Sequence, residues 1–324
     1  GLQNWKDEDS KTALSYTAGG KDSSYALFVQ DEIALTDSLT AYLGLRHDWW
    51  ETSDGYANSV GDAGYPKQYG SQEESSLTPK AALVYRPFSD TTLRLSAGQA
   101  FRAPSTYDLY RTWTSSSGRT YAANPTLKPE TVTSYDGGIA QGLWPGMKVK
   151  GTYFYNEMED MIYRETISST LSEYTNAGKA RSQGVELEAE QRFDSGLRLF
   201  ANYTYTDAEI TENQNYPDYV GNRPRYVPEH MFNIGLDLRY GPLTAGLVSH
   251  YRSEMFQSNA NSTVNWEVYG VQDEVPFVTD LTVGYDFMEQ YNLSVTVTNL
   301  FDSEYFLWNK APGTAMFGML SAKF

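Results

Sequence analysis

Apolar and polar residues alternate one by one along most of the chain. Residues 293–298 read Leu-Ser-Val-Thr-Val-Thr, and the same rhythm runs through residues 232–239 and 185–190. Successive side chains of a β-strand point to opposite faces, so each of these segments has one apolar and one hydrophilic face. No long segment repeats its apolar residues with the period of an α-helix. The pattern therefore predicts an all-β fold.

About fourteen alternating segments can be marked, and the connections between them alternate in length. The expected strands are residues 11–18, 23–35, 38–50, 76–88, 90–103, 131–143, 147–163, 182–193, 196–210, 229–241, 243–256, 275–287, 290–301 and 313–324. Short connections, rich in turn-forming residues, lie at 36–38, 89–90, 144–146, 194–196, 241–242 and 288–290. Long polar connections lie at 51–75, 104–130, 164–181, 211–228, 257–274 and 302–312, whereas the first of this series, at 19–22, is short.

The rhythm of short and long connections predicts where each kind lies in space. In a meander of antiparallel strands, every tight turn falls at one end of the sheet and every long loop at the other. Outer-membrane β-barrels have this layout, with short periplasmic turns and long external loops. Arg94, Lys150 and Arg198 fall on the polar faces and would line a wet lumen, while the apolar faces would contact lipid. We therefore expect an antiparallel transmembrane up-and-down β-barrel with about fourteen strands in this chain.

The segment at residues 23–35 fits this pattern least well. Asp31 falls on the same face as the apolar Val29 and Ile33. A β-bulge would resolve the conflict, and so would a stretch of wall that turns this face toward the lumen. Both alternatives stay open from the sequence alone.

The composition agrees with a lipid-facing wall. The 324 residues include 26 Tyr, 14 Phe and 7 Trp, and many fall near the ends of expected strands, where membrane interfaces favour aromatic rings. No stretch approaches the roughly 18 apolar residues of a spanning helix. The net charge of −16 argues against a nucleic-acid partner, and the absence of cysteine excludes disulfides and thiolate sites. A soluble β-sandwich or β-helix is the alternative, although neither requires such long strands with uniformly polar faces.

The last expected strand alternates to the end of the sequence and finishes on Phe324. It resembles the terminal strand of outer-membrane proteins, which the barrel-assembly machinery recognises by its final aromatic residue. The resemblance implies that machinery as a partner. It also implies the bacterial outer membrane as the location, with its lipid and lipopolysaccharide as surroundings.

Several short motifs carry a more specific resemblance. Residues 101–104 read Phe-Arg-Ala-Pro and precede Asp-Leu-Tyr at 108–110, and residues 124–130 read Asn-Pro-Thr-Leu-Lys-Pro-Glu. Asn-Ala-Gly-Lys-Ala follows at 176–180, Gly-Val-Glu-Leu-Glu at 184–188 and Thr-Asn-Leu-Phe-Asp at 298–302, with Tyr305 beyond. In this order, at expected strand ends, the motifs resemble the β-barrel of TonB-dependent outer-membrane receptors. We expect most of these residues to shape strand ends and loops rather than to contact a ligand.

The resemblance implies a barrel of about 22 strands around an N-terminal plug domain. Fewer strands are expected here, and neither a plug nor a TonB box is recognised. We therefore expect residues 1–324 to be the C-terminal portion of such a barrel domain, with TonB acting through a plug absent from this chain. The alternative is a complete fourteen-stranded passive pore, because an even number of strands can also close.

The resemblance also implies the uptake of a scarce, bulky nutrient. A ferric siderophore or another metal chelate is the expected ligand, while haem, cobalamin and an oligosaccharide are alternatives. Haem receptors of this family place a ligating histidine in the loop that corresponds to residues 105–123, and this loop contains none. Haem is therefore disfavoured, although a tyrosine ligand stays open.

Tyrosine and arginine crowd two of the expected loops. Aromatic rings can stack on a planar chelate, and guanidinium groups can bind its carboxylates or catecholates. The candidate residues are Tyr107, Tyr110, Arg111, Trp113, Arg119 and Tyr121 in one loop, Tyr216, Tyr219, Arg223, Arg225 and Tyr226 in another, and His250 with Arg252 on an inward strand face. The alternative is that these side chains pack against one another and hold the loops in place.

No enzyme is expected. The chain has no Gly-rich phosphate loop after a strand, no His-rich metal spacing and no Gly-x-Ser-x-Gly elbow. Glu186 and Glu188 share one strand face, but carboxylates in a wet lumen more commonly bond neighbouring strands or a plug. No cofactor and no resident metal site are predicted.

Overall fold

The computed structural model describes residues 2–9, 16–59, 63–176, 178–256, 258–261, 275–288, 290–307 and 309–323. Its main sheet has fifteen strands, of which the short β4 (Lys67–Gln68) pairs with β3 beside the main path. The others follow one another in chain order, each antiparallel to the next. They are β1 (Leu2–Asp9), β2 (Tyr16–Ala34), β3 (Leu39–Ser59), β5 (Gln72–Phe88), β6 (Thr91–Arg102), β9 (Glu130–Trp144), β10 (Met147–Glu159), β13 (Lys179–Arg192), β14 (Leu197–Glu212), β15 (His230–Tyr240), β16 (Leu243–Arg252), β17 (Val275–Phe287), β18 (Tyr291–Thr298) and β21 (Ala315–Ala322).

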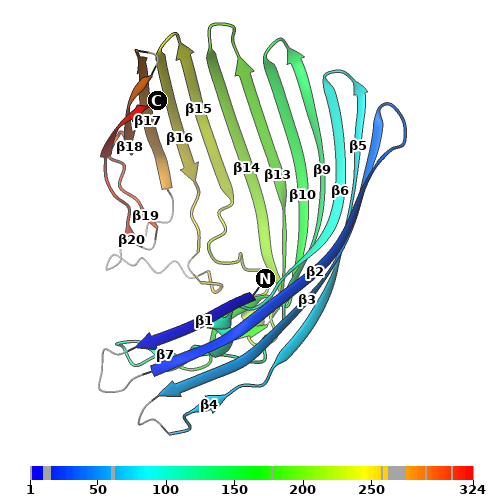
Figure 1. The fold of residues 1–324 in the computed structure, drawn as a ribbon, viewed down its shortest axis with the longest axis vertical. Helices are drawn as coiled ribbons and strands as arrows, with labels where there is room; N and C mark the ends of the chain where they lie inside the picture. Colours follow the sequence, from blue (N-terminus) through cyan, green and yellow to red (C-terminus); the bar gives the residue numbers. More distant parts are fainter. Residues whose placement is uncertain are drawn as a thin grey trace.

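This sheet forms one curved wall, shown in Figure 1. Short turns join the strands at one end, called the turn end, and longer segments join them at the other, called the loop end. Gly146 and Gly196 occupy left-handed positions in two of the turns, with φ of 81° and 85°. A Cβ atom at either residue would also clash with a main-chain carbonyl of the next hairpin. The predicted meander and its separation of turns from loops are therefore confirmed, except that the short connection expected at 19–22 is wrong because these residues lie inside β2.

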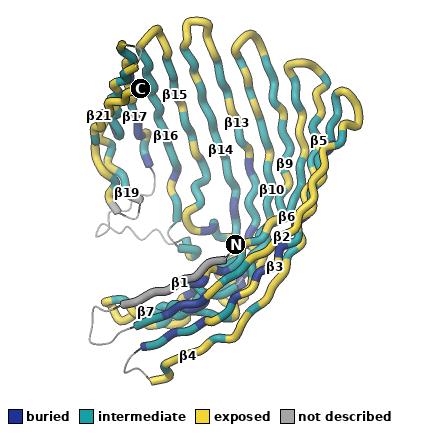
Figure 2. Tube along the Cα trace, in the orientation of Figure 1, coloured by how far each residue is buried: buried dark blue, intermediate teal, exposed yellow. Residues whose placement is uncertain are grey.

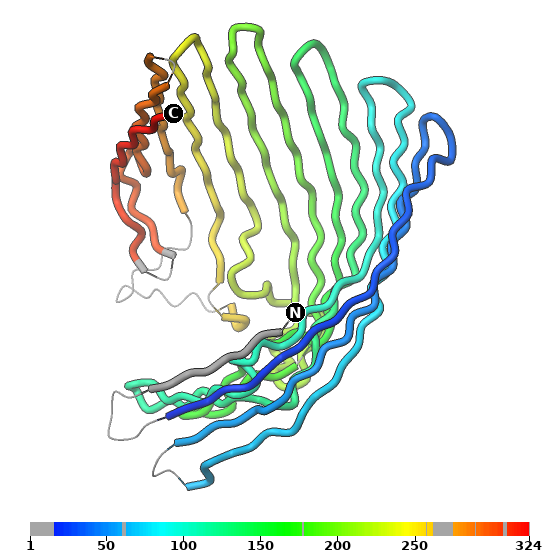
Figure 3. Tube along the Cα trace, viewed as in Figure 1, coloured from blue at the N-terminus to red at the C-terminus, as the bar shows by residue number. Residues whose placement is uncertain are grey.

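The wall is open in the described chain. Figure 3, coloured along the sequence, shows β2 and β21 at opposite edges of the wall. Among the described residues, β21 pairs with β18 and has no partner strand in β1 or β2. The closed fourteen-stranded barrel required for a passive pore is therefore not formed.

The two faces of the wall differ as the alternation predicts. Leu45, Leu187 and Ile234 lie on one face and are 43%, 53% and 48% exposed. The opposite face carries cross-strand ion pairs, among them Lys150 with Glu188 at 2.8 Å and Arg198 with Glu190 and Asp237 at 2.7 Å each. A single-layered sheet with so much exposed apolar surface indicates contact with lipid. The soluble sandwich alternative, which needs a second layer over that surface, is wrong.

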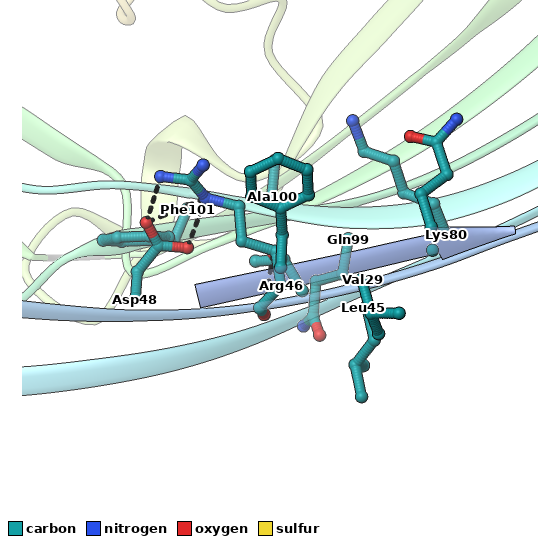
Figure 4. Close-up of a pocket in the computed structure, with 12 residues that line it drawn as sticks. Val29, Leu45, Arg46, Asp48, Lys80, Gln99, Ala100 and Phe101 are labelled. Atoms are coloured by element: carbon teal, nitrogen blue, oxygen red, sulfur yellow. Dashed lines mark hydrogen bonds and ion pairs between the residues drawn. The ribbon is translucent and has the colours of Figure 1, made fainter. Parts of the chain in front are cut away.

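Figure 4 shows this division at close range, beside a pocket of about 440 Å³ in the wall. Arg46 and Lys80 project toward the opposite part of the sheet, whereas Val29 and Leu45 project away from it. Arg46 donates hydrogen bonds to the carboxylate of Asp48 at 2.6 to 2.9 Å. The charge of Arg46 is thus neutralised within the wall.

The structure resolves the conflict at Asp31 differently from either expected alternative. β2 pairs with β3 without interruption from Lys21 to Ala34, and Asp31 lies opposite Leu43. Asp31 stays on the apolar face, exposed and close to the turn end. The register shift between β2 and β3 occurs instead between Gly19 and Lys21, at the loop end.

Several strand boundaries differ from those expected. The strand expected at 11–18 is replaced by β1 and by the start of β2 at Tyr16, while residues 10–15 lie outside the described chain. β3 continues to Ser59, so part of the connection expected at 51–75 is strand. The strands expected at 147–163, 243–256 and 290–301 end earlier, at Glu159, Arg252 and Thr298. Long strands such as β3 continue because their neighbours also continue and supply backbone hydrogen bonds.

A second, smaller sheet forms at the loop end. It contains β7 (Trp113–Thr114), β8 (Thr120–Ala122), β12 (Leu171–Asn176) and β11 (Ile162–Thr166), with the short helix α1 (Thr106–Tyr110) before β7. β8 and β12 are parallel, and the other pairs are antiparallel. Residues 103–129 and 161–176 are called the loop module below. The remaining small elements are η1 (Pro217–Tyr219), β19 (Phe306–Leu307) and β20 (Asn309–Lys310).

The loop module encloses the main hydrophobic cluster of the described chain. Trp50 of β3, Leu109 and Tyr110 of α1, and Leu127 are almost fully buried together. Figure 2 shows buried residues concentrated toward the loop end, whereas the wall is mostly half-buried or exposed. No helix in the described residues has the length and apolar character needed to cross a membrane.

Candidate ligand-binding site at the loop end

Two asparagines tie the halves of the loop module together. Asn124 donates a hydrogen bond to the main-chain oxygen of Tyr174 at 2.8 Å. Asn176 accepts from the N–H of Lys128 at 2.7 Å and donates to the carbonyl of the same residue at 2.9 Å. Both asparagines belong to the sequence motifs at 124–130 and 176–180. These contacts agree with a structural role for those motifs.

A stack of rings and guanidinium groups crosses one face of the small sheet. The guanidinium carbon of Arg111 lies 5.1 Å from the ring centre of Tyr107 and 5.8 Å from that of Trp113. Trp113 stacks on Tyr121 with ring centres 4.2 Å apart. Arg164 lies 4.6 Å from the ring centre of Tyr121 and 4.8 Å from that of Tyr174. The aromatic–cation array is defined as Tyr107, Arg111, Trp113, Tyr121, Arg164 and Tyr174.

Strand register explains why the array forms on one face. Trp113 pairs with Tyr121, and Arg164 pairs with Tyr174. Residues directly opposite each other on adjacent strands project to the same side. Arg164 also donates to the hydroxyl of Tyr174 at 2.6 Å, which fixes the guanidinium plane beside the ring. The array is therefore a pre-arranged surface of flat rings and positive charge.

Two donors of the array have no acceptor. Trp113 Nε1 and Arg164 Nε are buried, and neither makes a hydrogen bond within the described residues. Leaving a buried donor unpaired costs about 1–3 kcal/mol, so such groups are normally satisfied. Both donors lie inside the array, where the neighbouring side chains shield them from solvent.

Two other predicted residues of this loop hold it in place. The ring of Tyr110 is 1% exposed and lies in the hydrophobic cluster, against which Tyr174 of the array packs, so it does not face solvent. Arg119 donates to the main-chain oxygen of Ser169 at 3.3 Å and thereby links the two halves of the module. For these two residues the structure favours the alternative that the loop side chains hold one another.

The second predicted group lies in the loop after β14. Tyr216 and Tyr219 stack with ring centres 4.9 Å apart. Arg223 forms an ion pair with Glu229 and lies 5.6 Å from the ring centre of Phe256. The charge of Arg223 is thus compensated inside the loop.

The remaining predicted residues lie outside the array. Arg225 and Tyr226 are exposed, and the guanidinium carbon of Arg225 lies 5.7 Å from the ring centre of Tyr226. His250 and Arg252 lie on β16, opposite Asn233 and Met231 of β15. Their role in ligand contact stays a prediction. Among the described residues, no group of three or more His, Asp or Glu side chains is arranged to hold a metal ion.

Sequence reasoning missed Arg164 and Tyr174, which complete the array. Both lie in the segment 164–181 that was expected to be an irregular connection. The signal was present, because two short runs rich in Tyr, Thr, Ile and Leu flank Ser-Ser-Thr at 168–170, a pattern typical of a hairpin.

A buried polar group joins the other face of the small sheet to the loop after β14. Asn213 donates to the hydroxyl of Tyr163, and Asn215 donates to the carboxylate of Glu165 at 2.6 Å. Burial raises the pKa of Tyr163 and also the pKa of Glu165. Both groups therefore favour their neutral forms, as expected for acids away from water.

Residues 3–300 match the family model described as the β-barrel of TonB-dependent-receptor-like proteins. The metal-pseudopaline receptor of Pseudomonas aeruginosa is 25% identical over 287 residues, which cover 87% of this chain and 37% of that receptor. The ferrichrome outer membrane transporter and phage receptor of Escherichia coli is 27% identical over 308 residues, which cover 92% of this chain and 37% of that transporter. The solved structure of the ferric yersiniabactin uptake receptor from Yersinia pestis matches with a TM-score of 0.69 and 21% identity. The match covers 99% of this chain and 48% of that receptor's chain.

The chain spans only 37% of the length of these two curated relatives. The likeness to the yersiniabactin receptor shows the fold, and the open wall corresponds to part of such a barrel. The family model extends over nearly the whole sequence, including both the wall and the loop module. The chain therefore belongs to the TonB-dependent receptors, as part of a β-barrel in the outer membrane of Gram-negative bacteria.

Proposed function

We propose that this chain forms part of the wall and ligand-capturing surface of a receptor that takes up a ferric siderophore or another metal chelate. Family membership supports transport, and the relatives include receptors for metal–pseudopaline and for ferrichrome. The aromatic–cation array carries the proposal, because stacked rings and guanidinium groups suit the flat aromatic groups and the oxygen donors that metal chelates present. A receptor role needs no catalysis by this chain.

We also propose that further strands complete the barrel. In the described chain, β1 pairs with β2 only as far as Ser23, so residues 25–34 of β2 form a free edge, as does one side of β21. Lipid supplies no hydrogen bonds to such edges, so a spanning sheet has to be closed. In the closed barrel, TonB would act through a plug domain.

The surroundings of the wall follow from the same proposal. Its apolar face would contact outer-membrane lipid and lipopolysaccharide. The barrel-assembly machinery would recognise Phe324, which lies outside the described residues. The charged face would meet water and the plug.

Equilibrium binding of iron-loaded chelates to the chain in detergent tests the ligand. The panel contains ferrichrome, ferric pyoverdine and ferric yersiniabactin, with haem and cobalamin as the alternative classes. We expect saturable binding of at least one ferric chelate. Binding of haem or cobalamin alone would overturn the assignment of ligand class, and binding of none would overturn the proposed receptor surface.

A matched pair of variants locates the binding surface. Arg164→Gln removes the cation between Tyr121 and Tyr174 and should weaken chelate binding about tenfold, the size of a desolvated cation–π contact. Arg86→Gln removes an exposed cation near the turn end and should leave binding unchanged. Equal effects of both substitutions would mean that the array does not bind the chelate.

A further inference from the structure

The loop end of β2 and β3 contains a notch made by two glycines. Gly19 pairs with Tyr56 and Lys21 pairs with Ser53, so Gly20 alone faces both Asp54 and Gly55. This is the geometry of a β-bulge, and Asp54 adopts a left-handed φ of 54° there. The bulge places two residues without side chains next to each other on the ribbon.

The ring of Tyr110 fills this notch. A Cβ atom built on Gly20 or on Gly55 would lie within 3.0 Å of that ring, closer than real Cβ contacts occur. Tyr69 stacks on the ring of Tyr110 with centres 5.4 Å apart. The side chain is thus held from both strands and from the loop between β3 and β5.

A second contact holds the main chain directly after the same ring. The N–H of Thr112 donates to the hydroxyl of Tyr16 at 2.8 Å, and this hydroxyl donates to the carbonyl of Tyr110 at 3.4 Å. The segment from Tyr110 to Thr112 is therefore fastened directly to β2.

This anchor lies next to the aromatic–cation array in the sequence. Tyr107 and Arg111 flank Tyr110, and Trp113 follows two residues after Arg111. The rest of the array is joined to these residues by the small sheet. Displacing the ring of Tyr110 from the notch would consequently move the array relative to the wall.

We propose that Tyr110, Gly20 and Gly55 are positioning residues, which dock the loop module on the β2–β3 ribbon and set the place of the array over the wall. None of the three needs to touch the ligand. The consequence for ligand affinity rests on the proposed function, whereas the docking itself does not.

A spin label on the tip of the β7–β8 turn reports docking without any ligand. The chain has no cysteine, so Ser116→Cys, at an exposed position, can be labelled alone. The mobile fraction of the label in the electron paramagnetic resonance spectrum of the full chain measures undocking. Gly20→Ala and Gly55→Ala should each raise this fraction about tenfold or more, because overpacking of this kind forces the ring out.

The matched control is Gly44→Ala on β3. A Cβ atom at Gly44 would have no neighbour closer than 3.9 Å, so the label should stay immobile. Tyr110→Phe keeps the ring and should also stay docked, whereas Tyr110→Ala should release the module. A phenylalanine variant as mobile as the alanine variant would overturn the proposal that the ring is the docking element.

A double-mutant cycle separates docking from general instability. With Tyr110→Ala in place the notch is empty, so adding Gly55→Ala should raise the mobile fraction by no more than about twofold. Additive effects, or an immobile label in Tyr110→Ala, would overturn the proposal. Tyr110→Ala adds no bulk, so we also expect its circular dichroism spectrum to show an intact β-sheet.

Chelate affinity supplies the functional readout. The probe is a ferric chelate that binds the unmodified chain, for example ferrichrome. Gly55→Ala should weaken its binding by about tenfold, and Gly44→Ala should leave it unchanged. Unchanged affinity with a mobile label would overturn the role in positioning the array. Absence of chelate binding with the expected label mobilities would overturn the proposed function and leave the docking established.

Discussion

Leucine side chains have opposite surroundings in the wall and in the loop module. On the wall, Leu187 is 53% exposed on a single-layered sheet, whereas Leu109 of the module is fully buried. The wall is held by its ladder of backbone hydrogen bonds and by the surrounding lipid, because lipid replaces a second layer. The module is held by packing, as a soluble protein is. The effect of a substitution therefore depends on which surroundings the side chain meets.

The largest effect is expected in the core of the module. Leu109→Ala removes a fully buried side chain and should destabilise the module by about 2–5 kcal/mol. Hydrogen exchange of the β8 and β12 amides in the full chain measures this loss, while the wall amides should keep their protection. Leu187→Ala is the matched control, and equal loss of protection in both variants would contradict the distinction between the two regions.

A charge on the apolar face of the wall should have the next largest effect. Leu187→Arg should destabilise the chain in lipid vesicles by about 2–4 kcal/mol if its site lies near the bilayer midplane, as the measured depth dependence of such substitutions indicates. Glu186→Arg, the adjacent position on the charged face, should cost much less. Urea midpoints of the two variants in vesicles measure the difference, and similar midpoints would mean that this face does not contact lipid.

The tie between the halves of the module should matter less than its core. Asn176→Ala removes the hydrogen bonds to Lys128 and to the carbonyl of Asp160, at a cost of about 1–3 kcal/mol. Hydrogen exchange of β12 measures the loss, and Thr166→Ala, an exposed position of the same hairpin, serves as control. Equal protection in Asn176→Ala and the control would argue against the tie.

The smallest expected effect depends on pH. Burial raises the pKa of Glu165 above its ordinary value of 4.5, so the folded loops hold this proton more tightly than the unfolded chain does. The contact between the module and the loop after β14 should be fully stable below pH 4.5 and weaken as the pH rises through the raised pKa.

Glu165→Gln should abolish this pH dependence and give greater protection of β11 than the unmodified chain at neutral pH. Hydrogen exchange at pH 4 and pH 7, corrected for intrinsic exchange rates, measures it. Glu173→Gln, the paired position on β12, is the control. A pH dependence that survives in the glutamine variant would show that another group causes it.

The wall could be predicted almost entirely from the sequence. Alternation assigns a face to each residue, and turn-forming residues such as those at 145–146 and 241–242 locate the turn end. The extension of β3 to Ser59 could not be predicted, because residues 51–59 are mostly polar and show no apolar face. Thr52, Gly55, Ala57 and Ser59 are buried, and Gly55 lies against the ring of Tyr110 in the module, a partner that is distant in the sequence.

Four of the six residues of the array could be predicted, and the other two could not for a similar reason. The density of aromatic and basic residues singled out Tyr107, Arg111, Trp113 and Tyr121. Arg164 and Tyr174 join them through pairing between β8 and β12, and local pattern carries no information about that pairing. The burial of Tyr110 likewise depends on Gly20 and Gly55, whose significance appears only when the bulge brings them together.

β8 and β12 are neighbours in space but belong to separate hairpin connections of the wall, and their parallel contact joins Thr120 to Leu171. Contacts between such distant residues form late, because the entropy of closing the intervening chain has to be overcome first. The array should therefore be assembled only after β6, β9, β10 and β13 have come together. A chain whose wall is misassembled would therefore lack the aromatic–cation array, so the array and the wall are completed in the same step of folding.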